Sequence, residues 1–234
     1  MSKKPYGLFC PTSKASEVLE PRWTIQILGE LWEGATRFNE IRRGIPNISP
    51  SLLSKRLKEM QENGLIERVE DRATGNVEYF RTQMAIDFEP IQHAMAMWAQ
   101  KHVEADVALS EKDADVLMWT LRKRIEVHEM PLKRNVLRFH FTDVVGACET
   151  YWVITKPGEP PEVCIHDPQL DIDLFVETEV SVLTGIYLGR IRLSQAVEAG
   201  KFFMSGDTRL ERNFDRWLRL SAYSDAPGLQ KIDI

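Results

Sequence analysis

The stretch Thr36–Glu67, TRFNEIRRGIPNISPSLLSKRLKEMQENGLIE, decides the fold of the first half of this 234-residue chain. Phe38, Ile41 and Ile45 follow one another at spacings of three and four, which predicts a short helix with one buried face. The Gly-Ile-Pro sequence at the end of this segment stops the helix, because proline cannot continue it. We therefore expect a short helix followed by a tight turn.

A second helix is expected directly after the turn. Ser49 supplies a side-chain cap, and Pro50 supplies a first-turn residue with a preset φ angle. Leu53, Leu57 and Met60 fall on one side of the helical wheel. An alternating apolar segment follows and predicts a strand, so the whole stretch has the order expected of a winged helix-turn-helix.

Residues 36–58 are strongly basic, with six Lys and Arg and a single acid, Glu40. An α-helix fits the major groove of B-DNA, where lysine reaches the acceptors of guanine and serine hydroxyls meet several base edges. The second helix is therefore predicted to read DNA, although a pair of solvated helices in an ordinary α-rich domain explains the periodicity equally well. The predicted DNA contacts are Arg37, Arg42, Arg43, Ser49, Ser51, Ser54, Lys55, Lys58 and Arg72.

The neighbouring segments complete this domain. Residues 16–31 are expected to form one helix that supports the DNA-reading pair. Residues 65–69 and 77–81 alternate as two antiparallel strands would, with Thr-Gly-Asn in the turn between them. This hairpin is the candidate wing, and Arg72 near its tip would reach a phosphate or the minor groove. A surface hairpin with an incidental arginine is the other interpretation.

A helix expected over residues 87–103 carries an apolar stripe. Phe88, Ile91, Met95 and Trp98 follow one another at alternating spacings of three and four. The stripe predicts a seam at which two copies of the chain pair as a homodimer. The open alternative is that it packs on its own domain or on the second one.

Residues 105–112 form a short polar bridge, which we expect to link a domain over 1–104 to a domain over 113–234. Strands are expected in the second domain over 136–141, 151–155, 163–166, 170–176 and 202–204. Helices are expected over 116–125, 179–188, 193–199 and 208–220. This order predicts an α+β fold in which helices cover one face of a sheet.

Composition and charge limit the class of protein. The chain has no apolar run long enough to span a membrane, and its basic N-terminus lacks the apolar segment of a secretory signal. Residues 1–104 are charge-balanced, so the net charge of −5 resides in the second half, which is not expected to touch nucleic acid. Cys10, Cys148 and Cys164 are too few and too scattered for a disulfide framework or a zinc site. We therefore expect reduced thiols and a cytoplasmic protein.

No motif calls for catalysis. The five histidines lack the HExxH spacing, and the sequence has no Gly-rich phosphate loop and no nucleophile elbow. Asp171 and Asp173 alternate on one face of a predicted strand and are expected to be solvent-facing charges. We predict neither an enzyme nor a bound metal or cofactor.

Several short motifs occur together in a specific order over roughly residues 8–104. They are Cys10-Pro11, Arg22-Trp23-Thr24, Ile27-Leu28, Gly34, Arg37-Phe38-Asn39-Glu40-Ile41, Ile48-Ser49-Pro50, Leu53-Ser54, Arg56-Leu57, Gly64-Leu65-Ile66 and Val77-Glu78-Tyr79. As a set these motifs resemble the HxlR family of bacterial winged-helix regulators. The resemblance implies a homodimer built on the terminal helices of the domain, with the helix after Ser49 in the major groove and a wing on the flanking backbone. Some such regulators carry a redox-sensing thiol where this chain has Cys10, which makes Cys10 a candidate sensor. The family's usual Leu-Thr and nearby Gly after the second wing strand are replaced here by Arg81-Thr82-Gln83, so the start of the next helix stays open.

The second half contains a looser set of motifs over roughly residues 110–222. They are Asp167-Pro168, the alternating strand to Val176, Leu183-Thr184-Gly185, residues 196–200, and Ser205-Gly206-Asp207 followed by an amphipathic helix. Together they resemble the SCP2 (sterol carrier protein 2) fold. It implies an α/β sandwich with an apolar cavity that holds lipids or other hydrophobic molecules. The candidate cavity residues, each of which also fits a plain core position, are Leu174, Val176, Leu183, Tyr187, Phe202, Phe203, Trp217 and Leu218.

These patterns predict a homodimeric, sequence-specific transcriptional regulator that binds a pseudo-palindromic operator in double-stranded DNA. Its second domain would either sense a hydrophobic small molecule or add subunit contacts. The alternative is a lipid-binding or carrier module whose winged helix mediates protein contacts.

Overall fold

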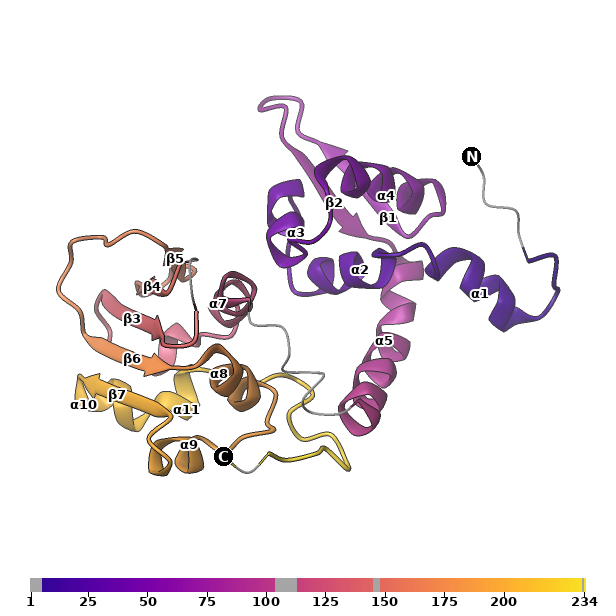
Figure 1. Ribbon diagram of the computed structural model, residues 1–234. Coiled ribbons are helices and arrows are strands. Elements are labelled where there is room, and N and C mark those ends of the chain that lie inside the picture. Colours follow the sequence, from indigo (N-terminus) through magenta and orange to yellow (C-terminus); the bar gives the residue numbers. More distant parts are fainter. Residues whose placement is uncertain (1–5, 104–112, 145–147, 233) are drawn as a thin grey trace. The chain divides into compact units, whose positions relative to one another are not determined.

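Figure 1 shows the computed structural model of the chain, which describes residues 6–103, 113–144, 148–232 and 234. The contacts divide the chain into two units, Met1–His93 and Ala94–Ile234. Helix α5 (Gln83–His102) begins in the first unit and ends in the second. The linker expected over residues 105–112 lies outside the described residues, so that boundary stays a prediction.

The first unit has the element order of a winged helix-turn-helix. Its core contains Ile27, Ile41 and Leu53, all fully buried, so the predicted inner faces of the two helices are confirmed. Phe38 only packs against the edge of this core. The elements are α1 (Pro11–Leu19), α2 (Thr24–Trp32), α3 (Phe38–Gly44), α4 (Pro50–Glu62), β1 (Ile66–Glu70), β2 (Val77–Arg81) and the first part of α5.

The single helix expected over residues 16–31 is wrong, because the chain forms α1 and α2 with a break between them. Pro21 lies in the break, where its ring and its missing N–H prevent helix continuation. Trp23 then adopts a left-handed φ of 83° as the N-cap of α2. The chain therefore changes direction before α2 begins.

The hairpin and the helix after it agree with the predicted pattern, with one shift. Strands β1 and β2 pair antiparallel from Ile66 opposite Arg81 to Glu70 opposite Val77. Helix α5 begins at Gln83 rather than at residue 87. The carbonyl of Thr82 accepts from the N–H of Ala85 at 3.1 Å and thereby closes the first turn.

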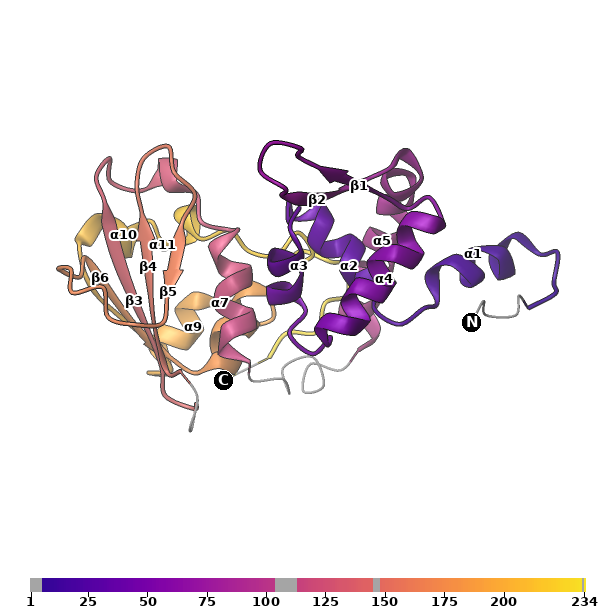
Figure 2. The same ribbon diagram turned by 90° about the horizontal axis from the view of Figure 1, so that it is seen from above.

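The second unit is a mixed five-stranded sheet with helices, in strand order β5-β4-β3-β6-β7 (Figure 1); Figure 2 shows β3 to β6 of this sheet from above. Strands β3 and β6 are parallel, and the other neighbours are antiparallel. The strands are β3 (Asn135–Phe141), β4 (Thr150–Thr155), β5 (Glu162–Cys164), β6 (Leu174–Thr178) and β7 (Phe202–Gly206). The helices are α7 (Ala114–Arg122), η1 (Val127–Glu129), α8 (Val180–Tyr187), α9 (Leu193–Glu198), α10 (Thr208–Arg212) and α11 (Phe214–Trp217).

One face of this sheet is covered and the other is partly open, as the alternating pattern predicts. Phe139 and Val153 on the covered face share a core with Leu121 of α7 and Leu183 of α8. On the opposite face, Phe175 is 40% exposed. The predicted α+β class with one helix-covered sheet face is therefore confirmed.

The strand expected over residues 170–176 begins only at Leu174. The carboxylate of Asp173 accepts from the N–H of Val136 at 2.8 Å and from Nζ of Lys133 at 2.6 Å. The prediction that Asp173 is a solvent-facing charge is therefore wrong, whereas Asp171 is exposed. The side chain of Asp173 fixes the entry into β6 from a partner 37 residues away.

The last predicted helix, over residues 208–220, is also interrupted. It forms α10 and α11, with Asn213 between them. In a continuous helix the carbonyl of Leu210 would accept from the N–H of residue 214. Here that carbonyl accepts from the indole Nε1 of Trp217 at 2.8 Å, so a side chain takes the position of a backbone donor.

Candidate nucleic-acid interface

The start of α4 is fixed by the residues that the sequence singles out. Oγ of Ser49 accepts from the N–H of Leu52 at 3.3 Å, which makes Ser49 the N-cap, and Pro50 opens the helix. Oγ of Ser51 lies 3.2 Å from Oγ of Ser49. The predicted N-cap is therefore confirmed. The capping residue, Ser49, is also one of the serines expected to contact DNA.

The outer face of α4 carries small and cationic side chains. Ser51, Ser54, Lys55 and Lys58 are all exposed, and they lie along one side of the helix because Ser54 and Lys55 are each three or four positions from both Ser51 and Lys58. The opposite side packs into the core through Leu53, Leu57 and Met60. The core thus fixes which face of α4 is offered to a partner.

The lysines of this face form only long intrahelical ion pairs. Nζ of Lys55 lies 3.9 Å from Glu59, and Nζ of Lys58 lies 3.8 Å from Glu62. Such exposed pairs contribute little stability, so both ammonium groups can turn to phosphates or base edges. Arg56 differs, because its side chain is only 14% exposed and contacts Glu59.

Arginines of α3 lie beside the turn that leads to α4. Arg42 and Arg43 are exposed in the last turn of α3. Arg37 precedes α3 as its N-cap residue, and its Nε lies 3.7 Å from the carboxylate of Glu78 in β2. The positive charge of Arg37 is thus partly balanced, whereas Arg42 projects from an exposed surface.

The wing is hydrogen-bonded to the segment just before α3 and has a side-chain-stabilised turn at its tip. The N–H of Tyr79 donates to the carbonyl of Thr36 at 2.8 Å. At the tip, the hydroxyl of Thr74 and the N–H of Ala73 donate to Asp71 and lower the pKa of its carboxyl. Arg72 is exposed beside this turn.

Sequence reasoning missed the contributions of Thr36 and Asp71 to this surface. The signal for Asp71 was available, because an Asp followed by Thr and Gly within the next four residues is typical of a side-chain-stabilised turn. No local signal pointed to Thr36, because the hydrogen bond from the N–H of Tyr79 to the carbonyl of Thr36 joins residues 43 positions apart.

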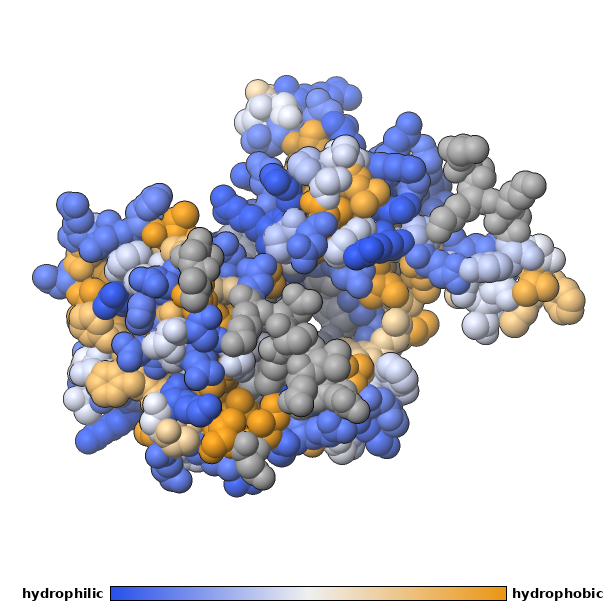
Figure 3. Space-filling view, in the orientation of Figure 1, coloured by the Kyte–Doolittle hydropathy of each residue, from blue (hydrophilic) through white to orange (hydrophobic). Residues whose placement is uncertain are grey.

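The stripe expected at a dimer seam is largely uncovered within this chain. Phe88 is buried in the first unit, whereas Ile91, Met95 and Trp98 are 55%, 45% and 62% exposed. Figure 3 shows hydrophobic side chains, in orange, at the surface where α5 runs in Figure 1. In the first unit an apolar groove of about 440 Å³ includes Met84, Phe88 and Ile91. A contiguous surface of large apolar side chains is typical of the places where proteins associate.

Cys10 lies directly before α1 and is exposed. The backbone N–H groups of Ser13 and Thr12, in the first turn of α1, lower the pKa of the Cys10 thiol. Among the described residues no group of three or more His, Cys, Asp and Glu is arranged to hold a metal ion. No helix within the described ranges is both long enough and apolar enough to cross a membrane.

The candidate cavity residues of the second unit lie mainly in its packed core. Phe203 differs from the others, because it is 59% exposed and projects from the opposite face of the sheet. Tyr187 is partly buried at the edge of the core. Those in the core are Leu174, Val176, Leu183, Phe202, Trp217 and Leu218.

Comparison with known proteins gives matches to the first part of the chain. A family model described as HxlR-like helix-turn-helix matches residues 18–107. The uncharacterized HTH-type transcriptional regulator YvaP of Bacillus subtilis is 34% identical over 97 residues, which cover 41% of this chain and 90% of YvaP. The HTH-type transcriptional regulator YodB of the same organism is 31% identical over 106 residues, 44% of this chain and 95% of YodB. A solved structure of the reduced form of YodB shares 31% identity with a TM-score of 0.37 and covers 42% of this chain and 97% of that one.

The helix pair, the wing and the basic face of α4 define a winged helix-turn-helix protein of the DNA-binding regulator class. The relatives are named as transcriptional regulators. The chain belongs to the HxlR-like helix-turn-helix family and is a DNA-binding transcriptional regulator of that type.

Proposed function

We propose that the protein acts as a homodimer on a pseudo-palindromic operator, with α4 in the major groove and the wing on the flanking backbone. The observation that carries the proposal is the outer face of α4, where Ser51, Ser54, Lys55 and Lys58 are exposed while the opposite face is locked into the core. A helix held in this way presents a fixed set of donors, which sequence-specific readout requires. Arg42, Arg43 and Arg72 would supply backbone contacts that set the register.

The second copy is proposed to pack on the apolar side of α5. Ile91, Met95 and Trp98 are exposed there, and the groove beside Met84 continues the apolar surface toward α1. A two-fold dimer would place its two recognition helices in half-sites about 10–10.5 bp apart, or a multiple of that distance.

A salt-dependent titration tests the proposed readout. The purified protein is titrated with genomic duplexes, including the DNA that flanks its own coding region, and with a random duplex as control. A specific regulator binds one fragment roughly a thousandfold or more tightly than the random duplex, and log affinity falls linearly with log salt. Weak binding to every fragment alike would reject sequence-specific readout.

A redox-sensing role for Cys10 is a second candidate function. It is supported by the exposure of the thiol and by the N–H groups of Ser13 and Thr12 that lower its pKa, because the thiolate is the reactive form. An oxidant is expected to weaken operator binding by the wild type and to leave the Cys10→Ser variant unchanged. Equal loss of binding in both proteins would remove Cys10 from the response.

For the second unit we keep an SCP2-like, hydrophobic-ligand-binding role as a proposal. The helix-covered face of the sheet, with Leu183 and Trp217 in its core, supports it. The alternative, a lipid-binding module whose winged helix mediates protein contacts, predicts ligand binding together with only weak, sequence-indifferent DNA binding. An apolar fluorescent probe added during the operator titration separates the two, because a sensing domain must change operator affinity when it binds its ligand.

A further inference from the structure

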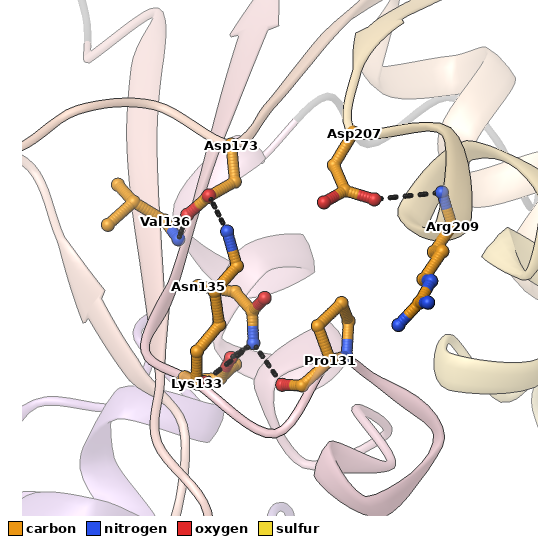
Figure 4. A network of polar contacts seen from close by, with 8 residues as sticks. Pro131, Lys133, Asn135, Val136, Asp173, Asp207 and Arg209 are labelled. Carbon is orange, nitrogen blue, oxygen red and sulfur yellow. Dashed lines mark hydrogen bonds and ion pairs between the residues drawn. The ribbon is translucent and has the colours of Figure 1, made fainter.

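The second unit contains a polar pocket that the DNA-binding role does not use. It has a volume of about 670 Å³ and is lined by residues 131–133, ahead of β3, and 206–209, between β7 and α10. Figure 4 shows Lys133, Asp207, Arg209 and Pro131 around its opening. Two chain segments more than seventy positions apart thus contribute charged groups to one hollow.

One buried acceptor lies behind this pocket, and one carboxylate opens into it. Asn135 is fully buried, and its amide nitrogen donates to the carbonyls of Pro131 and Lys133 at 3.1 and 2.9 Å. Its amide oxygen has no partner among the described residues, and Figure 4 shows that oxygen on the side toward Asp207 and Arg209. One oxygen of Asp207 accepts from the N–H of Arg209 at 2.8 Å, which leaves its second oxygen open to the pocket. Asn135 is not part of the pocket lining, so it is the carboxylate of Asp207 that favours an ammonium or N–H group on this side of the pocket.

The hydrogen-bond donors of this pocket are the side chains of Arg209 and Lys133. The guanidinium of Arg209 is exposed and makes no ion pair within the described parts of the chain. Nζ of Lys133 is fixed by Asp173 at 2.6 Å, and two of its three protons stay available. A guanidinium and a fixed ammonium together match the two oxygens of a carboxylate.

The pocket is held in shape by contacts outside its opening. Asp173 joins Lys133 to the N–H of Val136 at the start of β3. Gly206 has a φ of 153°, and a Cβ there would lie 2.2 Å from the carbonyl oxygen of Asp173. Only glycine therefore lets the end of β7 approach β6 closely enough to bring Asp207 beside Lys133.

A simple anion is a poor fit to this charge arrangement. Asp173, Asp207 and Glu211 lie around the site, and Glu211 accepts from the N–H of Gly206 at 2.6 Å. Their three negative charges exceed the two positive charges of Lys133 and Arg209, so a lone carboxylate or phosphate would be repelled as much as attracted. A ligand with one positive and one negative group can pair with both the acidic and the basic side chains of the site.

We propose that this pocket binds a small zwitterion of the α-amino acid type, with its carboxylate on Arg209 and Lys133 and its ammonium facing Asp207. Leu132, 85% exposed at the rim, offers an apolar surface to the side chain of the ligand. The proposal concerns the second unit alone and does not depend on DNA binding.

Calorimetric titration of the full chain tests the site. The probes are glycine and L-leucine, with acetate and methylamine as half-ligands that each carry one of the two charges. We expect saturable binding of both amino acids and at least about tenfold weaker binding of each half-ligand, because a charge-assisted hydrogen bond is lost in each case. Failure of both amino acids to bind, or equally tight binding of acetate, would overturn the proposal.

Substitutions locate the binding. Arg209→Gln is expected to weaken glycine binding by about tenfold or more, and Asp207→Asn by a similar factor. Arg212→Gln, an exposed arginine of the same short helix that does not line the pocket, is the matched control and is expected to bind as the wild type does. Because Arg209 is exposed, its substitution is not expected to disturb folding, and equal affinity in Arg209→Gln and wild type would reject the assignment.

Discussion

Replacing Lys55 by alanine isolates the readout role of α4 from its folding. Nζ of Lys55 lies 3.9 Å from Glu59, and the lysine side chain is 64% exposed. Glu59 keeps a second partner in Arg56 when Lys55 is removed, so no carboxylate is left unpaired. The free energy of unfolding is therefore expected to change by less than about 0.5 kcal/mol.

The cost to DNA binding is expected to be larger and dependent on sequence. A lysine that contacts guanine contributes about 1–3 kcal/mol of discrimination against the wrong base, which corresponds to about 5- to 150-fold weaker operator binding. A random duplex offers Lys55 only a phosphate, so the variant is expected to lose much less affinity there. The ratio of operator to random affinity should therefore fall.

Fluorescence anisotropy with labelled operator and random duplexes, repeated at several salt concentrations, measures these affinities. Arg42→Ala serves as a comparison, because a backbone contact is expected to weaken both duplexes evenly and to lower the salt slope by about one. Lys156→Ala is a matched control, since Lys156 is an exposed lysine of the second unit that also pairs with a nearby glutamate, Glu159, at 3.1 Å. Equal losses on operator and random DNA for Lys55→Ala would refute its role in base readout.

Three further predictions concern stability and assembly. Leu57→Ala removes a fully buried side chain from the first core and is expected to lower the free energy of unfolding by about 2–5 kcal/mol, measured by urea denaturation; an unchanged midpoint would contradict the assigned packing. Trp98→Asp places a charge on the exposed stripe of α5 and is expected to convert dimer to monomer in sedimentation with an unchanged circular dichroism spectrum, whereas a persistent dimer would move the interface elsewhere. Tyr151 is buried and donates to Asp115 at 2.8 Å, and burial raises the pKa of its hydroxyl. Stability linked to Tyr151 is therefore present below its unfolded pKa of about 10 and lost as pH rises above it, so the urea midpoint of Tyr151→Phe should fall less between pH 9 and about 11 than that of the wild type.

Local sequence signals predicted the DNA-reading surface well. The cap at Ser49, the proline after it and the spacing of Leu53 and Leu57 fix the start of α4 and its buried face, because capping and helical periodicity act within a few residues. The break between α1 and α2 also had a local signal, Pro21. The regular apolar spacing that begins at Trp23 nevertheless indicated one continuous helix.

Other features depended on contacts that join distant parts of the chain. The late start of β6 follows from the hydrogen bond between Asp173 and the N–H of Val136. The division between α10 and α11 follows from the indole of Trp217. The placement of Phe203 on the open face of the sheet follows from its register opposite Glu177. None of these can be derived from periodicity, because periodicity describes one segment without its neighbours.

The amino-acid sequence by itself determined the helix-turn-helix, the wing strands and the basic outer face of α4, since each of these depends on caps, turns and spacings within about a dozen residues. Only the tertiary structure decided that the stripe on α5 is largely exposed and that Lys133, Asp207 and Arg209 line one pocket. The physical reason is that burial and the meeting of charges are properties of packed segments, and the pairing of those segments is set by the whole core.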